Sequence, residues 1–147
     1  MANNRDRIEA RLRAAALKMT PQRFAVLDYL MRSSTHPTAE QVRADLNRRF
    51  PRASRATVYN TLNALRDAGL IHEIYMDDAV ARYDANIDPH HHFVCRKCGR
   101  LEDVPVSTVD ALSIAGLEPG HTVETYQIVM RGICARCNGR PARSPSA

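Results

Sequence analysis

Apolar residues recur every three or four positions in three stretches of the first half of the chain, which predicts three amphipathic helices. The first follows Thr20, with proline as the next residue, a pattern typical of a helix start. The second follows Thr38, which with Gln41 forms a capping box. The third follows Ser54 and ends at Gly69. The three apolar stripes are Phe24, Leu27, Leu30 and Met31; Val42, Leu46 and Phe50; and Val58, Leu62 and Leu65.

Two short extended runs come after these helices, at residues 70–76 and 80–84. The polar segment Asp77-Asp78-Ala79 joins them, which predicts a β-hairpin. Three helices followed by a hairpin are typical of a winged helix-turn-helix. A small helical bundle with an incidental hairpin is the alternative.

The outward face of the third predicted helix favours DNA recognition. At helical spacing, Ala56, Asn60 and Asn63 point away from the apolar stripe, with Thr57 and Tyr59 on its flanks. An asparagine amide can recognise the edge of an adenine, and threonine or tyrosine suits phosphate and methyl contacts.

The charge distribution supports this interpretation. The formal net charge is +5, and residues 1–66 hold 13 basic against 5 acidic side chains, whereas residues 84–147 hold 7 of each. An excess confined to one half favours a polyanionic partner, although a solvated basic face without a partner would show the same excess. The expected DNA contacts are Lys18, Arg23, Arg55, Thr57, Tyr59, Asn60 and Asn63.

The length and composition are those of one globular domain or two small ones. The chain has 147 residues, of which 44% are hydrophobic and 25% charged. No apolar run is long enough to span a membrane, and the N-terminus is too polar for a signal peptide, so we expect a cytoplasmic protein. No nucleophile and base stand out as a pair, and we therefore do not expect an enzyme.

All four cysteines fall in two C-x-x-C pairs, Cys95/Cys98 and Cys134/Cys137, with 35 residues between the pairs. Two such turns can close a tetrahedral site of four thiolates, the arrangement that structural zinc prefers. Disulfides are the alternative, which a reducing compartment disfavours. Basic neighbours are expected to help keep the thiols deprotonated: Arg96, Lys97, Arg100 and Arg136.

Three consecutive histidines precede the first cysteine pair, in a segment, 89–94, that is predicted to be a strand. Side chains of a strand alternate between its faces, so His90 and His92 share one face and His91 takes the other. The shared face indicates a metal-ligand pair. A purely structural role for these histidines is the alternative. Asp84 and Asp103 are nearby oxygen donors, and a nitrogen and oxygen set suits Fe(II) or Mn(II).

Six motifs, in this order, resemble the ferric uptake regulator family over residues 7–138. They are Thr20-Pro21-Gln22-Arg23, His36-Pro37-Thr38-Ala39-Glu40, Ala56-Thr57-Val58-Tyr59-Asn60, His90-His91-His92, Cys95-x-x-Cys98-Gly99 and Gly132-Ile133-Cys134-x-x-Cys137. Two positions resemble its peroxide-responsive (PerR) branch: Asp103, where iron sensors tend to have glutamate, and Asn60, where they tend to have arginine.

The resemblance implies an α+β fold and a homodimeric repressor that binds a palindromic operator in double-stranded DNA. It implies a winged-helix domain at residues 1–84, a hinge at 85–89 and a small α/β dimerisation and metal-binding domain with the four-cysteine zinc site at 90–138. We expect residues 139–147 to form a disordered tail. The implied regulatory Fe(II) or Mn(II) ligands are His36, Asp84, His90, His92 and Asp103. A further metal site found in some relatives is not expected, because Pro89 and Tyr126 stand where those proteins have histidines.

The resemblance also implies a sensing chemistry. Peroxide reacting with bound Fe(II) would oxidise His36 or His90, weaken metal binding and release DNA, whereas Mn(II) would give a repressor that is insensitive to peroxide. An iron-responsive or other metal-responsive repressor on the same fold is the first alternative. A thiol oxidoreductase that uses its C-x-x-C pairs is the second.

Overall fold

The computed structural model describes residues 3–75, 79–109 and 115–139. The chain divides into two compact units, Met1–Ile87 and Asp88–Ala147. Their boundary falls within the segment 85–89, whose role as a hinge stays a prediction. Asp77 and Asp78 of the expected turn, and residues 140–147 of the expected tail, lie outside the described residues. In the described part of the chain, no helix is both long and apolar enough to cross a membrane.

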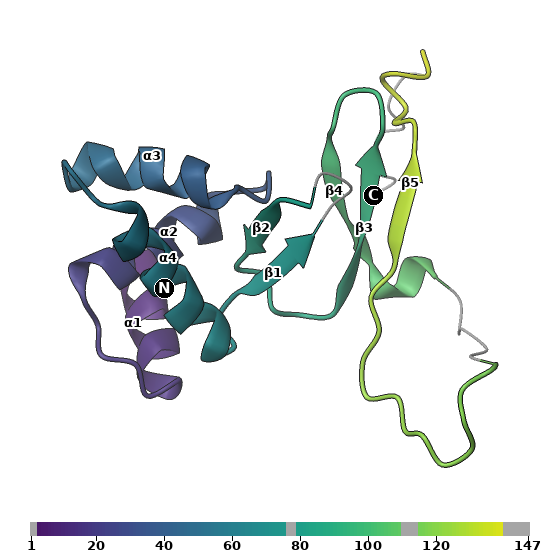
Figure 1. Cartoon of the computed structure of the whole chain (residues 1–147), viewed down its shortest axis with the longest axis horizontal. Helices are drawn as coiled ribbons and strands as arrows, with labels where there is room; N and C mark the ends of the chain where they lie inside the picture. Colours follow the sequence, from purple (N-terminus) through teal and green to yellow (C-terminus); the bar gives the residue numbers. More distant parts are fainter. Residues whose placement is uncertain (1–2, 76–78, 110–114, 140–147) are drawn as a thin grey trace. The chain divides into compact units, whose positions relative to one another are not determined.

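Four α-helices form the first unit: α1 (Asn4–Ala14), α2 (Pro21–Arg32), α3 (Ala39–Arg49) and α4 (Arg55–Asp67) (Figure 1). The three start signals predicted from the sequence are confirmed, because the side chains of Thr20, Thr38 and Ser54 each accept the backbone N–H three residues on. Gly69, with φ of +72°, follows the last helix in the left-handed conformation that favours glycine.

Helix α1 was not among the helices predicted from the sequence. Asn3 and Asp6 form a capping box at its start, and Ile8 and Leu12 are 0% and 1% exposed. The rest of the helix is so polar that its apolar stripe is reduced to these two residues. One turn apart, they pack into the same core as the inward residues of α2, α3 and α4.

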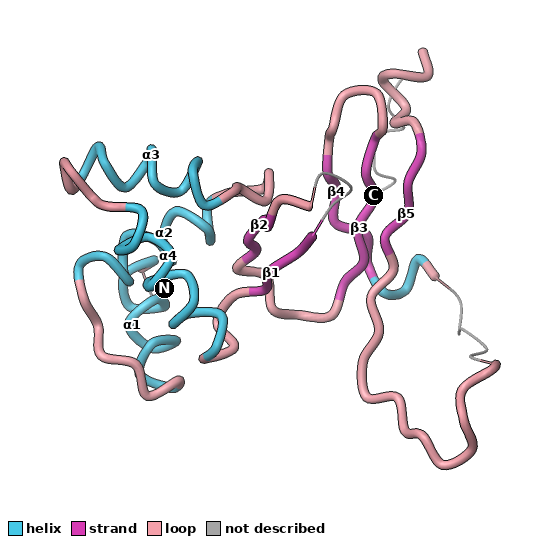
Figure 2. Tube along the Cα trace, in the orientation of Figure 1, coloured by secondary structure: helices cyan, strands magenta, loops and turns pink. Residues whose placement is uncertain are grey.

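The hairpin packs on this core and is not incidental, so the first unit is a winged helix-turn-helix. Strands β1 (His72–Tyr75) and β2 (Ala81–Asp84), which we call the wing, pair antiparallel (Figure 2). Tyr83 of β2 is 2% exposed within the core, and burial together with the Glu73 carboxylate raises its pKa to about 12. From α1, the Arg11 guanidinium donates hydrogen bonds to the carbonyls of Leu70 and Ala85, at 3.0 and 3.1 Å.

One buried carboxylate joins three of the helices. Asp28 of α2, 8% exposed, accepts hydrogen bonds from Asn4 of α1, from Arg32 one turn on, and from Arg49 of α3 at 3.3 Å. Replacing Asp28 by alanine should lower the free energy of unfolding by about 1–3 kcal/mol, because its donors lose their common acceptor. Urea unfolding followed by circular dichroism measures this loss. Asp67→Ala, at an exposed ion pair, is the control and should change little; equal effects would contradict the prediction.

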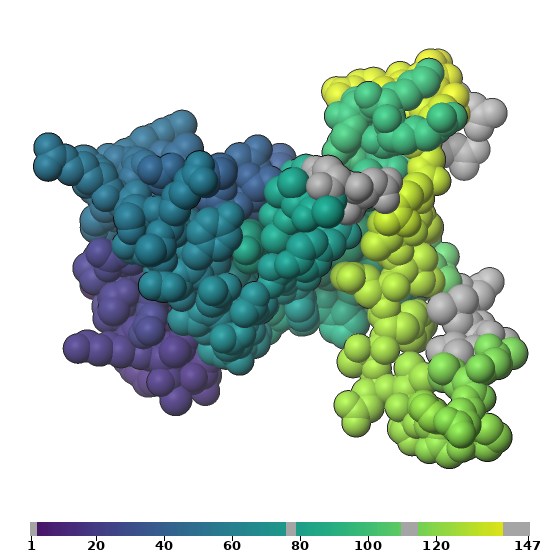
Figure 3. Space-filling model, viewed as in Figure 1, coloured from purple at the N-terminus to yellow at the C-terminus, as the bar shows by residue number. Residues whose placement is uncertain are grey.

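The second unit contains a three-stranded sheet in the order β4-β3-β5. Strand β3 (His90–Cys95) lies in the middle, antiparallel to β4 (Leu101–Pro105) and parallel to β5 (Val129–Gly132). A short 3-10 helix, η1 (Val106–Thr108), follows β4. Figure 3 shows all atoms of the chain in a space-filling view. Helices and strands together confirm the α+β class.

Candidate metal sites and nucleic-acid interface

The two C-x-x-C turns of the second unit converge. None of the four cysteines forms a disulfide, and their sulfur atoms lie within 4.8 Å of one another. Sγ of Cys98 and Sγ of Cys134 are 3.8 Å apart, close to the separation of about 3.8 Å that two ligands of a tetrahedral zinc have at a Zn–S distance of about 2.3 Å. The four cysteines therefore form a zinc site of four thiolates.

Backbone amides set the electrostatics of this site. The N–H of Cys134 lies 3.3 Å from Sγ of Cys95, and hydrogen bonds from the backbone of Cys134, Cys98 and Lys97 lower the pKa of Cys95 to about 6. Hydrogen bonds with the sulfurs of Cys134, Cys98 and Cys95 raise the pKa of Cys137 to about 12. The sequence had indicated basic side chains for this role, but backbone donors hold the first thiolate, and Arg100 pairs with Glu102 at 2.9 Å.

A second donor group lies inside the first unit. Nε2 of His36, in the turn between α2 and α3, is 3.1 Å from Oδ2 of Asp84 at the end of β2, and the residues are 4% and 8% exposed. The backbone N–H of Asn86 donates to the other carboxylate oxygen at 2.8 Å and so orients it. Two ligands at right angles on a metal ion, each at about 2.1 Å, are about 3 Å apart, so this pair fits one ion.

A third donor group lies on one face of the second unit's sheet. The alternation predicted for β3 is confirmed, since Nε2 of His90 and Nε2 of His92 lie 3.5 and 3.6 Å from the same Asp103 oxygen. The carbonyl of Asp88 lies 2.7 Å from Nδ1 of His90, and the Gln127 amide lies 3.3 Å from Nδ1 of His92. Such partners orient the rings and leave Nε2 to bind a metal.

The opposite face of β3 carries no comparable donor group in the described residues. His91 is 1% exposed, and its ring stacks on that of Tyr126 with 5.6 Å between centroids. Its Nδ1 accepts the N–H of Ile128 at 3.3 Å. In the described ranges, the donors that gather into possible metal clusters are the cysteines, His36 and Asp84 of the first unit, and His90, His92 and Asp103 of the second unit.

The candidate DNA contacts occupy two surfaces of the first unit. On α4, Tyr59 is 44% exposed, Asn60 is exposed, and Thr57 and Asn63 are half-buried beside it. Arg55 pairs with Glu40 at 3.2 Å in an exposed ion pair, which is weak enough to exchange for a phosphate. In the first turn of α2, the Arg23 guanidinium donates to the Lys18 carbonyl at 2.7 Å, and the Lys18 side chain, in the loop before α2, is exposed.

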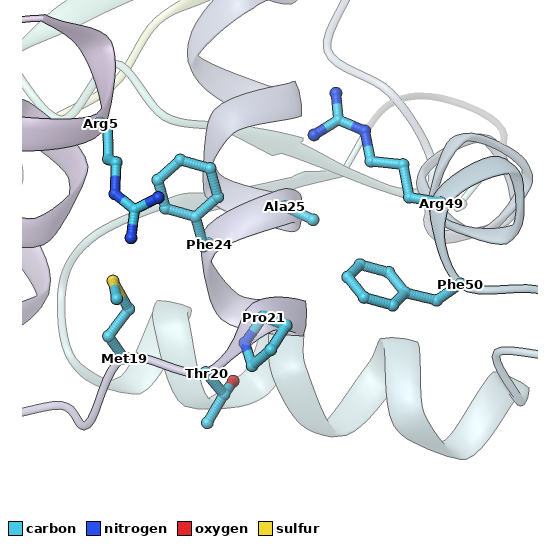
Figure 4. A pocket seen from close by; sticks show the side chains of 8 residues that line it. All are labelled: Arg5, Met19, Thr20, Pro21, Phe24, Ala25, Arg49 and Phe50. Carbon is cyan, nitrogen blue, oxygen red and sulfur yellow. The ribbon is translucent and has the colours of Figure 1, made fainter.

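A pocket of about 300 Å³ opens beside the start of α2 (Figure 4). No pattern in the sequence indicated it, because its lining comes from α1, from α2 and the loop before it, and from the end of α3. Arg5 lies 5.8 Å from the centre of the Phe24 ring and pairs with Glu9, and Arg49 pairs with Asp28. Since both arginines already have partners, the pocket offers an apolar wall and no unneutralised charge to a ligand.

Comparisons with known proteins agree with these sites. The model of the ferric uptake regulator family matches residues 14–131. The chain is 35% identical to the peroxide operon regulator of Bacillus subtilis over 128 residues, which are 86% of this chain and 88% of that protein.

Solved structures show the same fold. PerR from Streptococcus pyogenes, described in connection with peroxide sensing and gene regulation, matches with a TM-score of 0.52 and 31% identity over 92% of this chain and 94% of its own. The ferric uptake regulator Fur of Helicobacter pylori matches with a TM-score of 0.66 and 21% identity over 96% and 93% of the two chains. The chain therefore belongs to the ferric uptake regulator family, as a metal-responsive regulator with a structural zinc and a regulatory Fe(II) or Mn(II), and is most like the family's peroxide-responsive members.

Proposed function

We propose that this protein is a metal-dependent, DNA-binding transcriptional repressor that senses peroxide through oxidation of its own metal ligands. The observation that carries the proposal is the buried pair of His36 and Asp84 inside the first unit, whose nitrogen and oxygen lie 3.1 Å apart and could bind one metal ion. The names of similar proteins support it, since they include a peroxide operon regulator and a peroxide-responsive repressor.

One Fe(II) or Mn(II) ion would be bound by donors from both units. His36 and Asp84 supply two, and His90, His92 and Asp103 supply three. Each set alone is small for a metal that commonly takes five or six ligands, and both consist of nitrogen and oxygen, as Fe(II) and Mn(II) prefer. Binding by all five fixes one orientation of the units about residues 85–89. The ion then acts as an effector by stabilising that orientation, with a typical coupling of about 1–3 kcal/mol.

Helix α4 would read the operator. Its exposed face offers Tyr59, Asn60 and Asn63 to base edges, while Lys18 and Arg55 supply charge for phosphates. In a homodimer, two such helices are related by a twofold axis and therefore require a palindrome whose half-sites match their spacing.

Peroxide would act on the ligands. Fe(II) held by these ligands would supply one-electron reducing chemistry toward peroxide, which Mn(II) would not supply readily. In the net reaction, one oxygen of hydrogen peroxide is added to a ring carbon of His36 or His90, the ring loses two electrons, and the other oxygen leaves as water. An oxidised ring is a poorer nitrogen donor, so the two units separate and the operator is released.

Operator binding with each metal, before and after peroxide, tests the proposal. The probe is a duplex selected from random-sequence DNA in the presence of Mn(II), which should contain an inverted repeat. We expect Fe(II) and Mn(II) to promote binding equally, and hydrogen peroxide to abolish binding with Fe(II) only. Mass spectrometry should find one added oxygen on the peptide of His36 or His90.

The outcomes separate the candidate functions. Loss of binding under both metals, or under neither, would contradict peroxide sensing at this site. Binding that follows Fe(II) occupancy and survives peroxide would indicate an iron-responsive repressor. Failure to select any duplex would contradict a DNA-binding role.

A further inference from the structure

The turn between α2 and α3 continues the sheet of the wing. His36 lies opposite Asp84, the carbonyl of Pro37 accepts the N–H of Tyr83 at 3.0 Å, and Thr38 forms an antiparallel bridge with Arg82. The three pairs follow the register of an antiparallel ladder, in which one residue number rises as the other falls. Strand β2 therefore has β1 on one edge and the α2–α3 turn on the other.

The metal donors of the first unit are one pair of this ladder. His36 has φ of +51°, a left-handed conformation that costs a residue with a Cβ about 1 kcal/mol or more. Surrounding contacts must hold it there, and the conformation directs the imidazole toward Asp84. A ligand common to both side chains would close the ladder at the point where the backbone is most strained.

The strand pairing within the wing contributes little stability by itself. The wing has four residues in each strand, and a two-stranded hairpin of this length is only marginally stable by itself. The turn that holds its outer edge also connects α2 to α3, the helix that precedes the recognition helix α4. An interaction that holds the His36 side chain to Asp84 therefore also holds the wing to the helix-turn-helix.

We propose that the α2–α3 turn and the wing form a metal-responsive clamp within the DNA-binding unit: ligation of His36 and Asp84 locks the wing beside α4, and loss of the His36 ligand releases it. This proposal rests on the proposed function and adds a second effect of the same ion. The metal orders the DNA-binding surface itself, besides fixing the orientation of the two units. Peroxide would then act twice, because an oxidised His36 both loosens the wing and frees the units.

The amide of Tyr83 reports directly on the clamp, because it donates to the carbonyl of Pro37. Hydrogen–deuterium exchange of the full-length, zinc-loaded chain, read at single residues by mass spectrometry, should show its exchange slowed about tenfold or more by Mn(II). The amide of Leu62, in the middle of α4 and fully buried, exchanges through global unfolding of the unit, so its slowing measures the general stabilisation by Mn(II), and the clamp predicts a larger slowing at Tyr83.

Two variants separate the clamp from a general stabilisation. His36→Asn retains a residue that tolerates the left-handed backbone but removes the imidazole. Without Mn(II) its Tyr83 amide should exchange about tenfold faster than in the unsubstituted chain, and Mn(II) should not slow it. His72→Ala removes the histidine opposite Asp84 on the other edge of β2 and is the matched control, with exchange and Mn(II) response retained.

Tyr83 exchange and Mn(II)-dependent DNA binding, measured together, test the clamp and the proposed function separately. Tyr83 exchange that does not change with Mn(II), while Mn(II) still promotes binding to the selected duplex, overturns the clamp alone. If Mn(II) promotes no DNA binding, the proposed function falls. The comparison without Mn(II) still tests the clamp in that case. Equal Tyr83 exchange in His36→Asn and in the unsubstituted chain would also overturn the clamp.

Discussion

Replacing His36 by alanine is expected to abolish the metal-dependent part of DNA binding while zinc content and helix content stay unchanged. Nε2 of His36 is the only nitrogen donor proposed from the first unit, and it lies 3.1 Å from Asp84. Without this nitrogen, an ion bound by the second unit is coordinated too weakly by the DNA-binding unit to fix its orientation. At a typical coupling free energy, the metal raises the affinity for DNA about 5- to 150-fold, and the variant should lose this whole increase. Fluorescence anisotropy with the selected duplex, with and without Mn(II), measures the loss.

The controls distinguish ligand loss from misfolding. His121→Ala removes an exposed histidine whose Nδ1 lies 2.9 Å from the Glu118 carbonyl, and it should keep the full Mn(II) response. His36→Asn preserves the left-handed turn and should behave like His36→Ala. A normal Mn(II) response in both His36 variants would refute the ligand role of this histidine and, with it, the shared metal.

Local signals in the sequence were sufficient for most elements that position the site. A capping side chain and an apolar stripe act within a few residues, and the helices after Thr20, Thr38 and Ser54 all begin as predicted. Period-two alternation likewise placed His90 and His92 on one face of β3. Helix α1 was missed because only Ile8 and Leu12 carry its periodicity, and two apolar residues do not distinguish a helix from a polar segment.

The sites themselves depend on contacts that no local pattern contains. His36 precedes a proline at the end of a helix, and its residue type indicates a helix-end cap as readily as a ligand. Only the resemblance to a family singled it out. Its neighbour Asp84 is 48 residues away, and what brings the two together is the ladder between the α2–α3 turn and β2. Asp103 is a similar case, since its place opposite His92 follows from the register of β3 and β4.

The second large effect is expected from loss of the zinc site, because the first C-x-x-C turn sets this register. In the first C-x-x-C turn, the N–H of Cys95 donates to the Arg100 carbonyl at 2.9 Å and the N–H of Gly99 donates to the Cys95 carbonyl at 2.8 Å. The turn thereby sets which residue of β4 faces which residue of β3. Replacing Cys134 by serine should prevent zinc binding and unfold the second unit, because a small sheet with a metal site gains much of its stability from the metal. The first unit, with a core of its own, should keep its helices.

Exchange and metal analysis measure this outcome together. In Cys134→Ser, zinc should fall below one per chain, amides of β3 and β5 should exchange without protection, and the α4 amides should stay protected. Arg136→Ala, within the same turn and without a sulfur, should keep its zinc, since backbone donors rather than basic side chains hold the Cys95 thiolate. A folded second unit without zinc in Cys134→Ser, or an unsubstituted chain whose four thiols form and break disulfides reversibly, would instead favour a thiol oxidoreductase. Because the zinc turn places Asp103 opposite His92, the zinc-free protein should also lose its Mn(II) response, although every regulatory ligand is still present in its sequence.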